Sequence, residues 1–435
     1  MKKKYIRTHL LLVLFGMNKI LAALNFSGQT FNDYDFTQHY ESNELVGTDF
    51  SGASLINCNL TNFDLTDANL SNANLTGTIL INANLTDANL TGADLTNAIL
   101  INSNLTSVTS DTTTKLNSAL LLNITGSLPN HTGTPITNTT ANLGIMIGTR
   151  LASKNLSRTN LSGLNLSNIN LSFSDLTYAN LRMTNLTSAN LMNTNFTNAH
   201  LTYAALGGTD LRNTILTNAN LTYTILLNSN LSNAFLRNLQ LFSANLTGAN
   251  LSNSDLTGSN LSNANLTNTD LTGSNLSNAI LINTQFILVI CNNPINLNGA
   301  IVLNINGSLP NYTGTPITNN TNDIGEAAGT KLVEKYLFGV DLSELNLSRL
   351  NLSGSNLSQS NLTNTNLTNA NLTNANLTSA ILTNTDLTKA ILNKVKGFTQ
   401  EDYIGSDINA YNSTSNIALH LILCKHNNET IPFLT

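Results

Sequence analysis

The stretch "NLTDANLTGADLTNAIL", residues 84–100, repeats a leucine every five residues. An α-helix turns by about 100° per residue, so steps of five would scatter these leucines around its axis. A flat strand would send successive leucines to opposite faces, because its side chains alternate. Neither regular element collects the leucines on one buried side.

The conflict disappears if the chain bends once in every five residues, always in the same sense. Each leucine (position i) then points inward together with the small residue at i−2, as Leu90 does with Ala88, because positions i and i−2 share a face. The residues at i−1 and i+1 face outward. Position i+2 takes the bend, where Asp87, Gly92 and Asn97 suit turn geometry. Coils of this kind stack into a β-solenoid.

The run A-(D/N)-L-(T/S)-(N/G/D) resembles the consensus of the pentapeptide-repeat proteins, and it continues through most of the chain. The resemblance implies an all-β fold, a right-handed quadrilateral β-helix with four pentapeptides per coil and Leu or Phe stacked inside. The repeat centres fall in three tracts, residues 50–105, 151–286 and 332–392, and all six prolines lie outside them. Four centres per coil would make a solenoid of about thirteen coils.

Two insertions, residues 106–150 and 287–331, interrupt the repeat. They contain "LNITGSLPNHTGTPITN" (122–138) and "LNINGSLPNYTGTPITN" (303–319), which match at a constant offset, so a larger module has been duplicated. The insertions are either loops that hang from one continuous rod or hinges between three shorter rods. We favour loops.

Both ends of the chain differ from the repeat. Residues 1–23 have a basic start, a short apolar run and small residues at the end, the layout of a secretory signal peptide. They predict export to the periplasm or outside the cell, with membrane contact only in transit; the alternative is a cytoplasmic protein with an amphipathic start. Residues 24–49 are expected to form the first coils and cap the rod. The tail, residues 393–435, is expected to cover the last coil or to join a second molecule in a homodimer.

The sequence offers little for catalysis. Its six histidines form no HxH or HExxH pattern, its three cysteines lie far apart, and its glycines form no GxGxxG motif. We therefore predict no catalytic residue, no cofactor and no metal site, and a protein that is not an enzyme.

The charge balance bears on nucleic-acid partners. The formal net charge is −5 over 435 residues. Some pentapeptide-repeat proteins resemble DNA in shape and charge and inhibit topoisomerases, which requires a strongly acidic surface. A nucleic-acid binder would need a basic stripe. The sequence supports neither.

Residues twenty apart should stack on one face if four pentapeptides make a coil. This rule places two isoleucine pairs and one tyrosine pair in outward columns, where exposed apolar side chains are candidate contact sites for a partner. The alternative is that Ile and Tyr only favour β structure. The candidate residues are Ile79, Ile81, Ile99, Ile101, Tyr203 and Tyr223.

Together these observations predict an exported, non-catalytic scaffold or rod that binds a protein whose identity the sequence does not give. Two alternatives remain open: a secreted effector acting on a host cell, and a cytosolic, topoisomerase-binding DNA mimic, which the weak negative charge disfavours.

Overall fold

The computed structural model describes residues 24–321 and 323–397. Contacts divide the chain into two units, with the boundary between Thr140 and Ala141, and each unit is described by itself. The expected signal peptide (1–23) and most of the tail (398–435) lie outside the described residues. No helix in the part that is described has the length and apolarity needed to cross a membrane.

Each pentapeptide makes one tight turn. In residues 85–89 the N–H of Ala88 donates to the carbonyl of Leu85 at 3.0 Å. Asp87, the third residue of that turn, has φ of 58°, as in a type II turn. Asn, Asp, Ser and Gly occupy this bend in most repeats, because they adopt positive φ more readily than other residues. The bend predicted at position i+2 is therefore confirmed.

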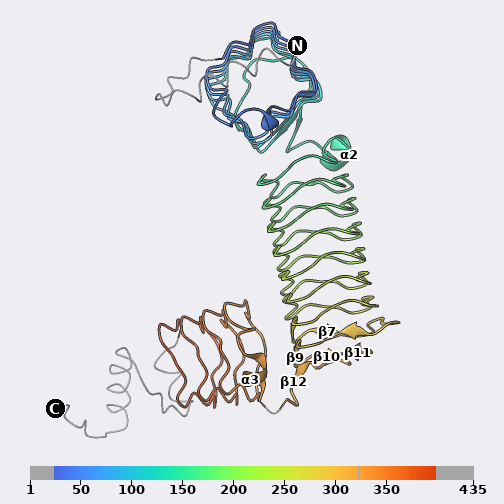
Figure 1. Cartoon of the computed structure of the whole chain (residues 1–435), viewed down its shortest axis with the longest axis vertical. Coiled ribbons are helices and arrows are strands. Elements are labelled where there is room, and N and C mark those ends of the chain that lie inside the picture. The colour runs from blue at the N-terminus through green and yellow to red at the C-terminus, as the bar shows by residue number, and fades with distance from the viewer. Residues whose placement is uncertain (1–23, 322, 398–435) are drawn as a thin grey trace, which may run out of the picture. The chain divides into compact units, whose positions relative to one another are not determined.

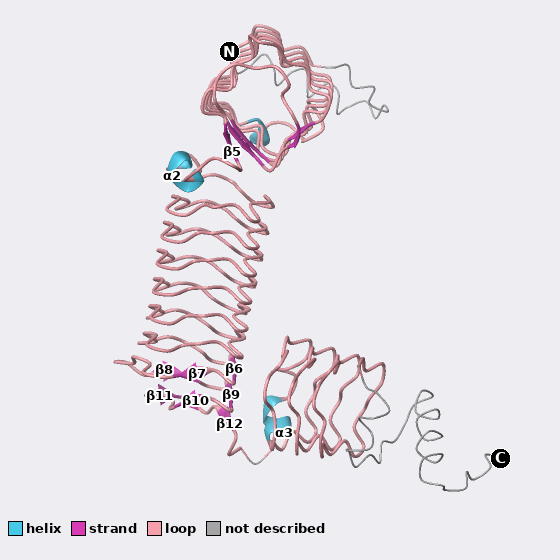
Figure 2. Ribbon diagram, turned by 180° about the vertical axis from the view of Figure 1, so that it is seen from behind, coloured by secondary structure: helices cyan, strands magenta, loops and turns pink. Residues whose placement is uncertain are grey.

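Successive coils stack through parallel bridges between residues twenty apart, such as Asn69 with Asn89 and Asn180 with His200. Leu85 donates its N–H to Asn104 in the next coil at 2.8 Å, and Asn89 donates to Ala68 in the previous coil at 2.9 Å. The expected parallel β-solenoid with four pentapeptides per coil is confirmed, and Figure 2 shows its stacked coils.

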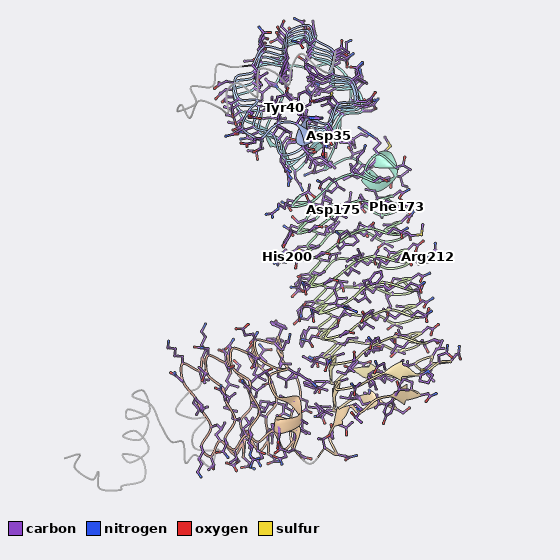
Figure 3. All side chains as sticks on the ribbon, viewed as in Figure 1. Asp35, Tyr40, Phe173, Asp175, His200 and Arg212 are labelled. Atoms are coloured by element: carbon purple, nitrogen blue, oxygen red, sulfur yellow. The ribbon has the colours of Figure 1, made fainter. Side chains whose placement is uncertain are left out.

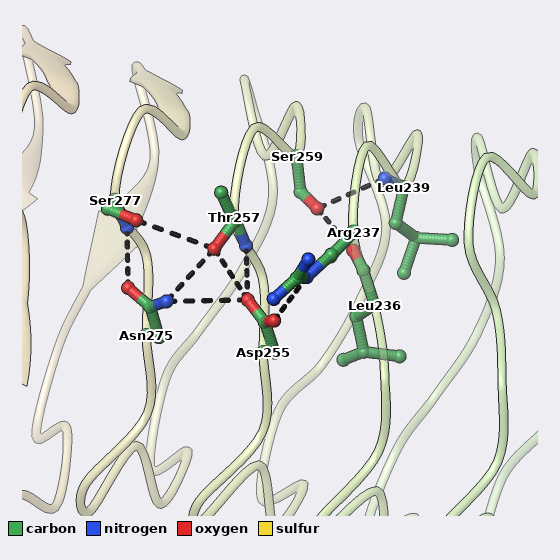
Figure 4. A network of polar contacts seen from close by, with 8 residues as sticks. All are labelled: Leu236, Arg237, Leu239, Asp255, Thr257, Ser259, Asn275 and Ser277. Atoms are coloured by element: carbon green, nitrogen blue, oxygen red, sulfur yellow. Dashed lines mark hydrogen bonds and ion pairs between the residues drawn. The ribbon is translucent and has the colours of Figure 1, made fainter.

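In each pentapeptide the bonds between coils and within the turn leave one backbone N–H without a partner. The side chain of the Asn or Asp at i−1 accepts a hydrogen bond from it. Asn84 accepts a hydrogen bond on Oδ1 from the N–H of Thr86, and Asp255 accepts one in the same way from Thr257. The same side chains also link neighbouring coils. The Nδ2 of Asn275 donates to the Oγ1 of Thr257 at 2.9 Å (Figure 4).

The interior is a column of fully buried leucines beside small residues. Where Thr or Ser replaces Ala at i−2, its hydroxyl is buried and at most positions donates to a leucine carbonyl, as Thr214 does to Leu211 at 2.7 Å; the hydroxyls of Thr48 and Ser360 are exceptions without a partner. A buried hydroxyl without a partner would destabilise the core. This bond explains why Thr and Ser are tolerated there.

Most coils contribute single bridges, so regular elements are few and occur mainly near the two insertions. They are η2 (Phe36–Gln38), β1 (Ile99–Ile101), β2 (Asn104–Leu105), β3 (Leu120–Leu122), β4 (Thr125–Gly126), β5 (Ile136–Thr137), α2 (Leu143–Ile147), β6 (Ile280–Ile282), β7 (Gln285–Phe286), β8 (Ile295–Asn296), β9 (Ile301–Leu303), β10 (Asn306–Gly307), β11 (Tyr312–Thr313), β12 (Ile317–Thr318) and α3 (Ile324–Ala328). Figure 1 marks several of them.

The interpretation of the insertions as loops on one continuous rod does not hold in the second unit, where the stack is interrupted after the second insertion. Each insertion continues the ladder, with β1 pairing to β3 and β3 to β5 in the first, and β6 to β9 and β9 to β12 in the second. Within the described residues the ladder then stops, and it starts again with Asn155 opposite Asp175 and with Tyr336 opposite Asn356. The five-residue helices α2 and α3 lie at the two breaks. A helical turn presents no extended backbone to a neighbouring coil, so the parallel pairing is interrupted where α2 and α3 form.

Residues 24–49 form the first coil of the first unit. Asn25 pairs with Asp49 and Asp35 with Asn59, so this coil is longer than the standard twenty residues. An aromatic cluster fills it. Phe36 is fully buried and packs 5.4 Å from Phe31 between ring centroids. Large rings cover more of the coil's open end than a leucine column would.

Candidate functional site

The structure corrects the predicted isoleucine column. Ile81, Ile99 and Ile101 are 0%, 4% and 0% exposed, and Ile79 is half-buried, so the expectation that all four are outward and exposed is wrong. Ile99 and Ile101 belong to β1, in which all three residues are buried. In the matching strand of the second module, β6, the outward isoleucines are covered by another segment of the same unit.

The predicted stacking of Tyr203 on Tyr223 is confirmed. Their ring centroids lie 4.9 Å apart with the planes 5° from parallel. The two tyrosines differ in surroundings: Tyr203 is 50% exposed, whereas Tyr223 is half-buried and meets Phe242 edge-on. Phe242 in turn meets Tyr336, which belongs to the third tract, with centroids 4.9 Å apart.

We call the surface that carries these residues the docking face. It consists of the row of pentapeptides in the second tract whose central leucines are Leu161, Leu181, Leu201, Leu221, Leu241, Leu261 and Leu281, together with the matching residues 299–304. Its covered half, residues 238–243, 258–263, 278–283 and 299–304, contacts the start of the third tract. Its open half, residues 158–163, 178–183, 198–203 and 218–223, precedes the covered half along the same columns. Figure 3 shows His200 of the open half on one side of the stack, with Arg212 and Phe173 on the other side.

The covered half holds the third tract partly through side-chain amides. Asn260 is fully buried and donates from Nδ2 to the carbonyl of Tyr336 at 2.9 Å. Asn304 donates to the carbonyl of Asp341, also at 2.9 Å. Lys331 adds a bond from Nζ to the carbonyl of Gly299 at 2.6 Å. The covered half thus holds the first coil of the third tract, whose backbone turns at Phe338 and Gly339, mainly by donating side-chain hydrogen bonds to its carbonyl groups.

Apolar packing completes this contact. The outward isoleucines of β6, Ile280 and Ile282, are 1% and 0% exposed. They belong to one buried cluster with Leu337 and Val340 of the third tract. Burying such side chains stabilises a contact by about 1.5–3 kcal/mol each. The face of a β-solenoid coil therefore serves here as a docking surface for polypeptide.

The pKa of the Tyr223 phenol reflects its position at the contact between the second and third tracts. Burial, helped by the neighbouring Tyr336, raises the pKa of Tyr223 to about 12 from an ordinary value of 10.0. Sequence reasoning found Tyr223 through the twenty-residue rule, but it missed Tyr336 because that residue lies in another tract. The five- and twenty-residue periods apply within one stack and do not predict contacts between two stacks.

Side chains whose chemistry could support a reaction have structural roles instead. Burial raises the pKa of the Cys58 thiol to about 11, which keeps it protonated and unreactive near neutral pH. The hydrogen bond from Arg212 lowers the pKa of Asp210, whose carboxylate also accepts from the backbone N–H of Arg212. Among the described residues, no group of three or more His, Cys, Asp or Glu side chains could hold a metal ion.

Comparison with known proteins places the repeat in a family. The family model "Pentapeptide repeats" matches the chain over residues 44–106, 155–288 and 328–393 in overlapping segments. A search of curated proteins gives no significant match.

Several solved structures are similar to the chain. HetL, a pentapeptide repeat protein involved in heterocyst differentiation regulation from the cyanobacterium Nostoc sp. strain PCC 7120, is 23% identical, with 75% of this chain and 87% of that chain covered and a TM-score of 0.21. A pentapeptide repeat protein of the Arabidopsis thaliana thylakoid lumen is 27% identical, covers 28% of this chain and 70% of its own, and has a TM-score of 0.18. QnrB1, a plasmid-mediated fluoroquinolone resistance protein, is 15% identical, covers 62% and 91%, and has a TM-score of 0.16.

Proposed function

Because the chain belongs to the pentapeptide-repeat family, we propose that it is an exported, non-catalytic scaffold whose solenoid faces bind another protein. Members of this family are typically protein-binding rods. One observation carries the proposal for this chain: the docking face already binds polypeptide, since its covered half holds the start of the third tract through Asn260 and the isoleucines of β6.

Export is the part of the proposal that rests on sequence alone. The basic start, apolar run and small residues of 1–23 support a signal peptide. The first coil begins directly after this segment, with Asn25 paired to Asp49. Cleavage near residue 24 would therefore leave the solenoid intact.

A DNA mimic that acts on topoisomerases has no specific support in this chain. The formal net charge of −5 is spread over 435 residues, with 19 Lys and Arg against 24 Asp and Glu. Electrostatic mimicry needs a dense acidic field. A secreted effector acting on a host cell would share the exported, protein-binding character proposed here.

The proposal is tested in the native host by fractionating the cells, cross-linking the fraction that holds the protein, and identifying the mature N-terminus and cross-linked peptides by mass spectrometry. We expect a chain that begins near Leu24 in the periplasm or medium, cross-linked reproducibly to one other protein. An intact Met1 in the cytosol would overturn export. Absence of any cross-linked protein would overturn the scaffold role.

A further inference from the structure

The open half of the docking face continues the covered half along the same columns. Outward residues at i+1 change steadily in exposure along one column: Arg182 is exposed, Thr202 is half-buried, and Thr222, Phe242 and Ile282 are 9%, 1% and 0% exposed. The aromatic contacts cross the boundary, since Tyr203 stacks on Tyr223 and Tyr223 meets Phe242. The open half is thus continuous with a surface that already binds polypeptide.

Bulky residues occupy bends in the open half although the solenoid does not need them there. Tyr178, Met183 and Tyr203 have φ of 59°, 56° and 62°, and they are 50%, 64% and 50% exposed. A left-handed backbone costs a residue other than Gly, Asn or Asp about 1–2 kcal/mol. Because these side chains are exposed, their burial offsets little of that free-energy cost. Aromatic and methionine side chains are enriched at protein–protein interfaces, and the open half holds these three on one face.

The charge of the open half has one sign. Arg158 lies with its guanidinium 5.1 Å from the centre of the Tyr178 ring, and Arg182 and His200 are also exposed. The segments that form this surface, residues 158–163, 178–183, 198–203 and 218–223, contain no Asp or Glu. Among the described residues neither Arg158 nor Arg182 forms an ion pair. Such a surface complements carboxylates.

We propose that the open half of the docking face binds an acidic segment of a partner protein that carries aromatic or large apolar side chains. The proposal rests on the scaffold function and names the chemistry of its partner. The covered half supplies the mode of binding: side-chain donors bind backbone carbonyl groups of the segment that lies on the face, and apolar groups pack beside it. In the open half Asn180, His200 and Asn220 occupy the column of Asn260. Tyr178, Met183 and Tyr203 provide the apolar contact, and the two arginines select acidic side chains.

The test uses the purified full chain and a displayed library of random peptides, selected in parallel on the wild-type protein and on two variants of the open half, Arg182→Glu and Tyr203→Ser. Matched controls lie away from this face. Phe173→Ser removes a ring that is 60% exposed at a bend with φ of 61°, and Arg212→Glu reverses a charge on the other side of the stack. Circular dichroism and thermal midpoints establish that every variant is folded.

We expect enrichment of acidic peptides with aromatic residues on the wild-type protein. One enriched peptide is then synthesised and its affinity for each protein is measured. This affinity should be about tenfold or more lower for each open-half variant than for the wild-type protein and should not change for the controls, because central aromatic and arginine contacts dominate such interfaces. The proposal is overturned if no such peptide is enriched, or if the four variants affect binding equally. It is also overturned if Arg182→Glu and Tyr203→Ser instead abolish binding to vesicles of phosphatidylglycerol and phosphatidylcholine, which would assign the surface to a membrane. These failures would leave the scaffold function standing, because host cross-linking tests it separately.

Discussion

The two halves of the docking face have the same backbone arrangement, but the third tract covers one half and leaves the other half exposed. In both, parallel coils pair at twenty-residue intervals and the same three positions of each pentapeptide point outward. In the covered half those positions hold Phe242, Ile280 and Ile282, which are buried against the third tract. In the open half they hold Arg182, His200 and Tyr203, which are exposed.

The difference teaches that the repeat determines the shape of the surface and not what binds to it. The inward leucines and the turn-capping Asn or Asp residues are equivalent in both halves. The side chains at the outward columns alone decide whether a coil is covered within the molecule or presents a surface to a partner. Substitutions at matched columns can therefore test the comparison directly.

The largest effect is expected from Ile282→Ala in the covered half. Removing buried methyl groups from the junction should lower the free energy of unfolding by about 2–5 kcal/mol. The loss should appear first as faster proteolysis between the second and third tracts. Guanidinium unfolding and limited proteolysis measure it. Thr202→Ala, in the same column of the open half, should change stability by about 0.5 kcal/mol or less. Equal effects of the two substitutions would contradict the comparison.

Asn260→Ala should have a smaller effect of the same kind. It leaves the carbonyl of Tyr336 and the backbone N–H of Ser262 without their hydrogen-bond partner in a buried place, which costs about 1–3 kcal/mol. Asn180→Ala is the control, because Asn180 caps Arg182 in the same way but is only half-buried, so water can replace it. Thermal unfolding of both variants measures the difference. A control as damaging as Asn260→Ala would mean that turn capping, and not docking, determines the cost.

The smallest effect should appear in the alkaline pH dependence. The pKa of Tyr223 is raised to about 12 in the folded chain, from 10.0 ordinarily. A raised pKa means that the folded state holds the phenol proton more tightly than the unfolded state does. Its contribution to stability is therefore complete below pH 10 and is lost as the pH rises from 10 towards 12.

Tyr223→Phe should remove this alkaline loss, and the absorbance titration of phenolate should lose its latest step. Tyr203→Phe serves as the comparison in the open half. If Tyr223→Phe leaves the titration curve unchanged above pH 11, Tyr223 is not held at the junction as described.

Sequence reasoning succeeded where the physics is local and periodic. The spacing of the leucines, the bend at residues such as Asp87 and the stacking of Tyr203 on Tyr223 all follow from the five- and twenty-residue periods. It failed where the chain leaves the period. Ile99 and Ile101 lie at outward positions, and only knowledge of what covers the outer face could have shown that they are buried. The duplicated phrase in the insertions identified a module but did not show that α2 and α3 separate three stacks.

The role of the capping residues was also missed. Sequence reasoning placed the residues at i−1 on the outside without giving them a role, whereas Asn84 and Asp255 each accept a hydrogen bond from the backbone N–H two residues ahead. Their regular occurrence at i−1 was the available signal, because the single N–H that faces away from the neighbouring coil needs an acceptor in every pentapeptide. The docking face itself could not be found, since Tyr336 lies far from Phe242 in the sequence.

The most direct test of the claim that one face carries both a covered and an open binding surface is hydroxyl-radical footprinting of the intact protein, alone and with the peptide selected on it. In the free protein Tyr178, Met183 and Tyr203 should be modified rapidly, and Phe242 and Tyr336 slowly. The peptide should then protect the first group and leave Phe173 unprotected. Rapid modification of Phe242 and Tyr336, or protection of Phe173 in place of Tyr203, would contradict the account.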